Sequence, residues 1–425
     1  MTHSEVHKPT DITVPPTSLW AKLPVIGAVM AVVGLGATFS MLAGELKSRA
    51  LFSYLWAFEV LLSIALGALG FVLIQHAVRA GWSTVIRRIA ETAAATLPVF
   101  ALLFIPIATI GFHELYPWTH ETDEVLERKR WFLNDGFWYG RAALYFVIWS
   151  GLAWFFYLRS TRIDSVTDET ERARLVRSMW WMAAPGILLW GLSQSFQAVD
   201  WLKSLMPHWY STMWGVYFFA GSIIAFYSFT ALVAMGLQRA GMLKTAITTE
   251  HFHDLGKFMF GHTIFWAYIA FSQFMLIWYA NIPEETEFFI HRIHGGWAGV
   301  SYALPVIHFF VPFLWLVSRH QKRSRVRLAI AAVWIIVVHC IDLYWIVLPN
   351  YVAGGLHGAA ADHGAQGSVH AAEVISTFAP HWLDLTALLG VTGVFLAAFG
   401  FLLNRNKVIA INDPRLAESM AHENY

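Results

Sequence analysis

The chain has 425 residues and a single cysteine, Cys340. One thiol cannot form an internal disulfide, and it cannot hold an iron–sulfur cluster or a structural cysteine-type zinc ion, each of which needs several thiolates. The sequence also lacks the Gly-rich dinucleotide fingerprint, the P-loop and the Gly-x-Ser-x-Gly elbow. These absences argue against hydride transfer, ATP hydrolysis and serine-hydrolase chemistry within this chain.

Charge is also scarce. Only 13% of the residues are charged, against roughly 25% in a soluble domain. By contrast, 57% are hydrophobic and 21 are tryptophan, a composition typical of packed membrane helices with interfacial aromatic belts. The net charge of +1 gives no indication of nucleic-acid binding. We therefore expect an all-α integral membrane protein.

Long apolar runs set the expected organisation. A spanning helix needs about 20 apolar residues. This rule predicts ten transmembrane helices within residues 23–403, flanked by tails of residues 1–22 and 404–425. We expect that the first tail is not a cleaved signal peptide. The expected spans are Leu23–Leu42, Leu51–Val78, Val85–Phe112, Gly136–Leu158, Trp180–Val199, Trp209–Leu237, Phe258–Tyr279, Gly295–Val317, Val326–Leu348 and Trp382–Leu403.

Basic residues orient these spans. If the amino terminus is cytoplasmic, the cytoplasmic segments hold most of the 29 basic residues, a bias of about three to one over the other side. We therefore predict that both termini are cytoplasmic. The long extracytoplasmic loop at 351–380 is rich in Gly and Ala and contains His357, His363 and His370. These histidines could bind a metal, but their irregular spacing favours a solvated loop or a partner-docking surface.

One stretch, Phe271–Phe289, runs from an apolar helix directly into Asn281-Ile282-Pro283 and two glutamates. Proline should end the helix near Ile282. Adjacent residues do not share a helix face, so at most one of Glu284 and Glu285 can point into the protein, while the other pairs with Arg292 or faces water. A solvated pair and a proton-handling site both fit.

A second stretch, Leu192–Trp209, resembles the first, since each has Ser-Gln within the membrane and an acid at the outer rim. This likeness indicates either two related halves or merely similar helix ends. Asp200 and His208 bracket an outer turn, where a carboxylate beside an imidazole could relay protons. Alternatively, Asp200 caps a backbone end and His208 makes an interfacial hydrogen bond. The functional interpretation is favoured because intramembrane acids are costly.

Other ionisable or polar side chains lie at inferred membrane depths. His262 and Gln273 fall near one stripe of a helix, and with Ser272 they could carry a water chain, although His262 as a core residue between helices is slightly favoured. Glu59 and Arg141 lie at a comparable outer depth and could form a buried ion pair. The remaining proton-path candidates, chosen from depth alone, are Asp135, His339 and Asp342.

Three functional classes fit these features from the residues alone. The first is a quinol- or proton-handling subunit of a respiratory complex. The second is a secondary transporter, which predicts paired mid-membrane helix breaks that the prolines do not form. The third is a dihaem cytochrome b, which needs two histidine pairs, whereas His262, His308 and His339 supply one pair at most.

The stretches Phe196–Gly215 and Phe271–Phe289 resemble the NrfD-like (polysulfide reductase NrfD-type) membrane subunits, in particular those of alternative complex III, a bacterial quinol:cytochrome c or quinol:acceptor oxidoreductase. The likeness covers nearly all ten spans. The length and polar tail are most similar to the F subunit of that complex. Asp200 and His208 match the family's Asp-Trp…Pro-His-Trp stretch. The family's Asn-Ile-Pro-Glu-Glu stretch is matched by Asn281, Glu284 and Glu285.

The resemblance implies two four-helix up-and-down bundles, at about residues 51–199 and 209–348, with flanking helices, in a bacterial inner membrane. It implies no cofactor in this chain, possible but doubtful quinone binding, and a proton path. The expected partners are a sister NrfD-like subunit, an extracytoplasmic iron–sulfur/molybdopterin-type subunit and cytochrome c subunits, which would hold the clusters and haem. A secondary transporter and a purely structural scaffold remain the alternatives.

Overall fold

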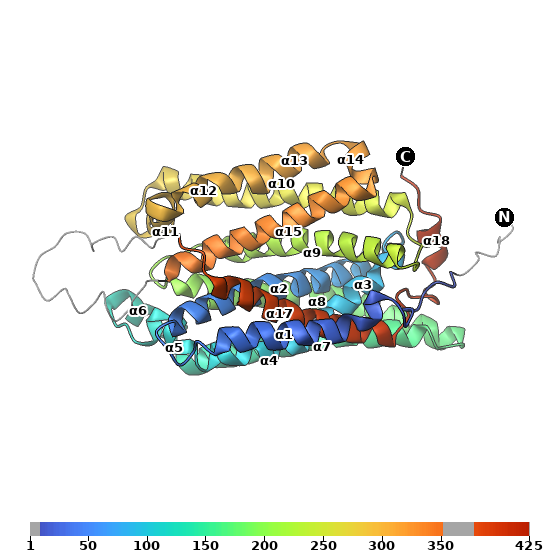
Figure 1. Cartoon of the computed structure of the whole chain (residues 1–425), viewed down its shortest axis with the longest axis horizontal. Helices are drawn as coiled ribbons and strands as arrows, with labels where there is room; N and C mark the ends of the chain where they lie inside the picture. Colours follow the sequence, from blue (N-terminus) through green and yellow to red (C-terminus); the bar gives the residue numbers. More distant parts are fainter. Residues whose placement is uncertain (1–8, 352–377, 425) are drawn as a thin grey trace, which may run out of the picture.

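The helices of the chain lie side by side along the long axis of the molecule (Figure 1). The computed structural model describes residues 9–351 and 378–424, and within them the regular structure is entirely helical. The longer helices are α1 (Leu19–Phe39), α2 (Lys47–Ala77), α3 (Thr84–Ala94), α4 (Leu97–Ala108), α7 (Asp135–Ile163), α8 (Glu169–Gln197), α9 (Trp214–Arg239), α10 (Thr249–Ala280), α11 (Pro283–Ile293), α15 (Arg325–Val347) and α17 (Trp382–Arg405).

Short helices connect or interrupt these. They are α5 (Phe112–Leu115), η1 (Pro117–Thr119), α6 (Glu124–Lys129), η2 (Ala198–Leu202), η3 (Lys203–Leu205), η4 (Gly295–Trp297), α12 (Ala298–Leu304), η5 (Pro305–Phe310), α13 (Val311–Leu316), α14 (Arg319–Arg323), η6 (Leu348–Asn350) and α18 (Leu416–Met420). Of these, η2 and η5 are π-helical. Such π-helical turns are rare and frequently lie at functional sites.

Nine helices or runs of consecutive helices in the described part of the chain are long and apolar enough to cross a bilayer, which indicates a multi-pass membrane protein. The segment expected as the fifth span is not among them. It forms α8, which begins at Glu169, well before the expected Trp180, and includes a charged first half. The expected third span is divided into α3 and α4, because Pro98, in the first turn of α4, has no N–H to donate to the carbonyl of Ala94, where α3 ends.

The core lies around α2 and α9, which pack against each other. Within the 18-residue apolar window of α2, 94% of the residues are buried, whereas the corresponding value for α1 is 11%. Helices α3, α4, α7 and α8 contact α2, and α10 and α15 contact α9. Polar side chains on α2 and α9 are therefore shielded from lipid by the surrounding helices.

Helices α1 and α17 pack against each other on the outside of α2. Their backbones touch at glycines: a Cβ on Gly34 would lie 2.3 Å from the Gly390 nitrogen, and one on Gly27 would lie 2.5 Å from the Ala397 nitrogen. Small residues allow this close approach in membranes, where packing rather than hydrophobic exclusion associates helices.

Both described ends of the chain lie at one end of the helical domain, which we call the terminal end; the other is the distal end (Figure 1). At the terminal end, the carbonyls of Asp11 and Ile12 accept hydrogen bonds from the N–H groups of Leu243 and Val408. The distal end contains α5, α6 and α11. Most of the predicted functional residues lie toward this distal end.

Candidate functional site

Asp200 lies in η2, directly after α8, and its side chain is fully buried. Nε and Nη2 of Arg141 donate to the two carboxylate oxygens at 2.8 Å each, and the hydroxyl of Tyr145 donates to Oδ2 at 2.6 Å. Arg141 and Tyr145 are four residues apart on α7 and so share one face. Arg141 also donates to the carbonyl of Phe132 at 2.9 Å. The charge of Asp200 is thus paired in a bidentate geometry, the strongest form of this interaction.

Two predicted pairings are wrong. Arg141 pairs with Asp200 and not with Glu59. His208 does not pair with Asp200, because its Nε2 lies 2.6 Å from Oδ2 of Asp123 in the distal loop. The backbone N–H of Leu126 and the bond from His208 lower the pKa of Asp123. Both partners of this ion pair are about 40% exposed.

Glu59 is fully buried on α2. Both of its carboxylate oxygens accept from Nε2 of Gln197 at 3.0 Å. One turn along α2, Oγ of Ser63 lies 2.8 Å from Nε2 of His339 on α15. Oε1 of Gln197 and Nδ1 of His339 have no hydrogen-bond partner among the described residues. The centre of the protein therefore contains polar atoms with hydrogen-bonding capacity left over.

Asp342, also on α15, is buried between α9, α10 and η5. Its Oδ1 accepts a short hydrogen bond from Tyr217, and its Oδ2 accepts from Nε1 of Trp266 at 3.1 Å. Nδ1 of His308, in η5, lies 3.9 Å from the same oxygen, and its ring packs against Trp266 in a tilted arrangement. Neither ring nitrogen of His308 has a hydrogen-bond partner in the described part of the chain. No arginine or lysine pairs with Asp342 there, in contrast to Asp200.

Helical spacing joins these groups. Gln197 and Asp200 are three residues apart, as are His339 and Asp342, and Glu59 and Ser63 are four apart, so each pair shares a face. We call the resulting set of groups the buried polar line, and it runs from α7 through α8, α2 and α15 to α9. Its members are Arg141, Tyr145, Asp200, Gln197, Glu59, Ser63, His339, Asp342, Tyr217, Trp266 and His308.

Tyr116, in the distal loop, lies next to the part of the buried polar line that contains Asp200. The Tyr116 hydroxyl donates to the carbonyl of Trp201 at 3.3 Å. Burial raises the pKa of Tyr116, and the charges of Glu59 and Asp200 raise it further. The Tyr116 hydroxyl therefore holds the distal loop against η2, which contains Asp200.

The glutamates of the outer rim lie apart from this line. As predicted, the proline ends the helix: α10 stops at Ala280, Asn281 takes a left-handed conformation, and α11 begins at Pro283. Oε1 of Glu285 accepts from the hydroxyl of Tyr210 at 2.7 Å, while Glu284 is exposed. Of the two alternatives predicted for the other glutamate, pairing with Arg292 is wrong, whereas Glu284 faces water.

Arg292 is instead buried and donates to the carbonyls of Phe288, Trp345 and Ile346. Burial lowers the pKa of Arg292 to about 9. This arginine binds the ends of α11 and α15 together through backbone oxygens.

Three other candidates also lie off the line. Asp135 is exposed in the first turn of α7. Oε1 of Gln273 accepts from Ser211 at 2.9 Å, and Nδ1 of His262 bonds to the Phe258 carbonyl one turn before it. The predicted water chain along α10 stays a prediction.

Sequence reasoning missed several members of the line. Tyr145 could have been found from its position four residues after Arg141, and Gln197 from its position three before Asp200. Tyr217 and Trp266 carry no such signal, because their link to Asp342 depends on contacts between distant helices.

Among residues 9–351 and 378–424, no group of three or more His, Cys, Asp and Glu side chains could hold a metal ion. His357, His363 and His370 lie outside the described residues.

No protein-family model matches the chain, and no curated protein matches it.

Proposed function

We propose that the chain is a membrane subunit of a respiratory quinol:cytochrome c or quinol:acceptor oxidoreductase, in which the buried polar line moves protons between the interior and the outer surface. The observation that carries this proposal is the burial of Glu59 and Asp342 without an arginine or lysine partner among the described residues. Ionisable groups in such positions are costly in a membrane, and they commonly serve proton relays.

The composition of the line supports proton transfer. Carboxylates, imidazoles, hydroxyls and an amide alternate along it, and each of the first three types can both accept and donate a proton as its protonation state changes. Buried atoms with no protein partner, such as Oε1 of Gln197 and both ring nitrogens of His308, are where ordered water would bind. Such waters would join groups that do not touch directly.

The arrangement of helices supports the resemblance to NrfD-like subunits. Helices α3, α4, α7 and α8 pack around α2, helices α10 and α15 pack on α9, and the two sets meet where α2 contacts α9. This fits two four-helix bundles. The two described chain ends lie at one end of the domain, which needs an even number of spans (Figure 1). At 29 residues, α8 is about 44 Å long and would supply the tenth.

In this role, quinol oxidation would release two electrons and two protons. The electrons would pass to the clusters and haem of the extracytoplasmic partners, and the buried polar line would accept or pass protons. A sister NrfD-like subunit is the expected membrane partner, and the chain would lie in a bacterial inner membrane with both termini cytoplasmic.

The test uses the assembly purified through a tag on this chain. We expect quinol-dependent reduction of cytochrome c or another acceptor. Turnover should decrease about 100-fold for Asp342→Asn or Glu59→Gln, the lower end of the range typical of lost acid–base groups. Glu284→Gln, which removes an exposed rim carboxylate, is the matched control and should retain turnover.

The haem absorbance of each preparation reports whether the assembly remains intact. If the assemblies are intact and both buried variants turn over like the control, the proton-transfer role is refuted and the chain is a scaffold. An assembly with no quinol-dependent activity would refute the proposed function.

A further inference from the structure

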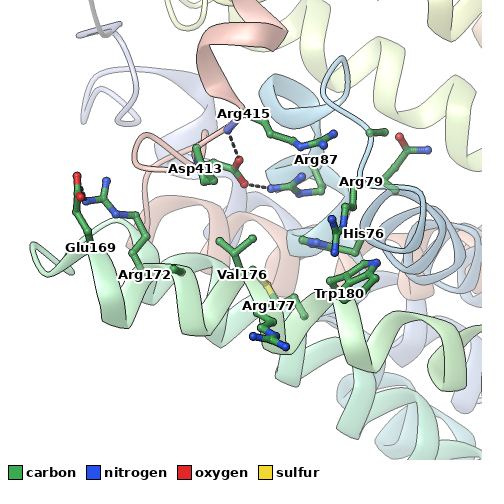
Figure 2. Close-up of a pocket in the computed structure, with 15 residues that line it drawn as sticks. His76, Arg79, Arg87, Glu169, Arg172, Val176, Arg177, Trp180, Asp413 and Arg415 are labelled. Carbon is green, nitrogen blue, oxygen red and sulfur yellow. Dashed lines mark hydrogen bonds and ion pairs between the residues drawn. The ribbon is translucent and has the colours of Figure 1, made fainter.

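A pocket of about 690 Å³ lies at the terminal end, far from most of the buried polar line (Figure 2). The end of α2, the start of α3, the first half of α8 and the segment before α18 form its walls. Its volume is within the range of pockets that bind small ligands. The charged residues that line it are Arg79, Arg87, Arg172, Arg177, Arg415, Glu169 and Asp413. Five arginines against two carboxylates give a formal charge of +3 with His76 neutral.

The inner wall is already neutralised. Arg87 is buried and bonds to Asp413 and, at 3.2 Å, to Oε1 of Glu91. Arg88, behind it, pairs with Glu91 at 3.1 Å and with Asp164 at 2.9 Å. These bonds connect α3, α7 and the carboxyl-terminal segment. The excess positive charge of the pocket must therefore come from its other arginines.

Those arginines have weak partners or none. The guanidinium of Arg79 lies over the ring of Trp180 at 3.7 Å, and Arg172 approaches Glu169 only at 4.0 Å. Within the described part of the chain, the side chains of Arg177 and Arg415 form no ion pair. Figure 2 shows these arginines among the residues that line the pocket.

Deeper in the pocket, two buried polar atoms have no hydrogen-bond partner among the described residues. They are Oε1 of Gln75, which is 5% exposed, and Nε2 of His76, which is 7% exposed. Nε2 of His76 lies 3.7 Å from Oε1 of Glu91, too far for a hydrogen bond. An imidazole nitrogen in this position can donate to an anionic oxygen.

An exposed apolar stripe begins at the pocket and continues along α8 toward the distal end. Trp181 is 61% exposed, Leu188 is 64% exposed and Leu192 is 52% exposed. Arg177 precedes Trp181 by one turn and so lies on the same face. This arrangement allows the arginines to contact a charged headgroup while the apolar stripe contacts the attached acyl chains.

We propose that this pocket binds the phosphate headgroup of an anionic phospholipid, with the acyl chains along the α8 stripe. Arginine recognises phosphate through paired N–H donors, and basic pockets between membrane helices commonly hold such headgroups. The apolar stripe favours a phospholipid over a free phosphate ion, which would not contact it. The site is independent of the proposed respiratory function.

The test is native mass spectrometry of the full chain, stripped of lipid in detergent, with phosphatidylglycerol and with phosphatidylcholine of the same acyl chains. We expect phosphatidylglycerol to be retained in preference. Arg172→Ala should weaken its binding about fivefold, and the further change Arg79→Ala should weaken it about 25-fold in total. Each arginine near an anionic lipid surface contributes about 1 kcal/mol, which corresponds to about fivefold in affinity. Arg174→Ala is the matched control, because Arg174 is exposed on the same helix outside the pocket.

Equal retention of the two lipids by the unsubstituted chain would overturn the proposal, and this measurement needs no variant. Equal loss in Arg172→Ala and Arg174→Ala would mean general attraction to the basic surface, which also overturns it. Inorganic phosphate at millimolar concentration serves as competitor. Complete displacement of phosphatidylglycerol by it would assign the pocket to the free anion instead.

Discussion

The ion pair between Arg141 and Asp200 leads to a specific prediction about stability. Both side chains are less than 10% exposed, and they join α7 to η2 through two hydrogen bonds of 2.8 Å. Asp200→Asn leaves the guanidinium of Arg141 buried without its counter-charge. We expect this change to lower the free energy of unfolding by about 3–5 kcal/mol, the usual cost of removing one partner from a buried pair.

Arg141→Met should have a cost of similar size, because it leaves the carboxylate with only the Tyr145 hydroxyl among its side-chain donors. The double variant no longer holds an unpaired charge. We therefore expect it to cost no more than either single variant, which corresponds to a coupling of about 3 kcal/mol between the two sites.

The assay is equilibrium unfolding of the purified protein in mixed micelles, followed by tryptophan fluorescence. Trp138 and Trp201 are buried beside the pair, and the summed fluorescence of the 21 tryptophans follows global unfolding. The losses of unfolding free energy in the two single variants could instead add up, within about 0.5 kcal/mol, to the loss in the double variant. That result would refute the interpretation of a coupled buried pair.

Three further predictions concern other parts of the chain. Burial and the charge of Lys129 lower the pKa of Lys203 to about 8. The unfolded state therefore binds more protons than the folded state between pH 8 and 10.5, so stability should rise with pH in that window. In thermal unfolding, Lys203→Met should remove this rise, while the control Lys244→Met should keep it. Gly34→Leu should destabilise the protein by at least about 2 kcal/mol because its Cβ would meet the backbone of α17, whereas Gly36→Leu, with open space around it, should have little effect in the same unfolding assay. His208→Ala should increase limited proteolysis of the distal loop but change global stability by less than about 1 kcal/mol, because its ion pair is exposed.

The helical class, most helix positions and the helix end before Pro283 could be predicted because they depend on local properties, namely apolar length and proline chemistry. The partners of the buried groups could not. Glu59 and Gln197 are 138 positions apart, and Ser63 and His339 are 276 apart, so their pairing depends on how the helices pack. Membrane depth placed Glu59 near Arg141, and a short outer turn placed Asp200 near His208, but neither carries information about which way each side chain points.

The π-helical turns illustrate the same limit. Asp200 lies in η2 and His308 lies in η5, so both side chains come from π-helical turns within otherwise α-helical segments. Regular helical spacing does not predict such turns. Pro305 marks the start of η5, but a proline also fits a simple kink.

The proposal that the buried polar line handles protons can be tested by infrared difference spectroscopy of the purified assembly, recorded before and after addition of quinol. Our account predicts a change in the carboxylic-acid carbonyl band that Asp342→Asn and Glu59→Gln each diminish and Glu284→Gln leaves intact. A difference band that is the same in all three variants would contradict it.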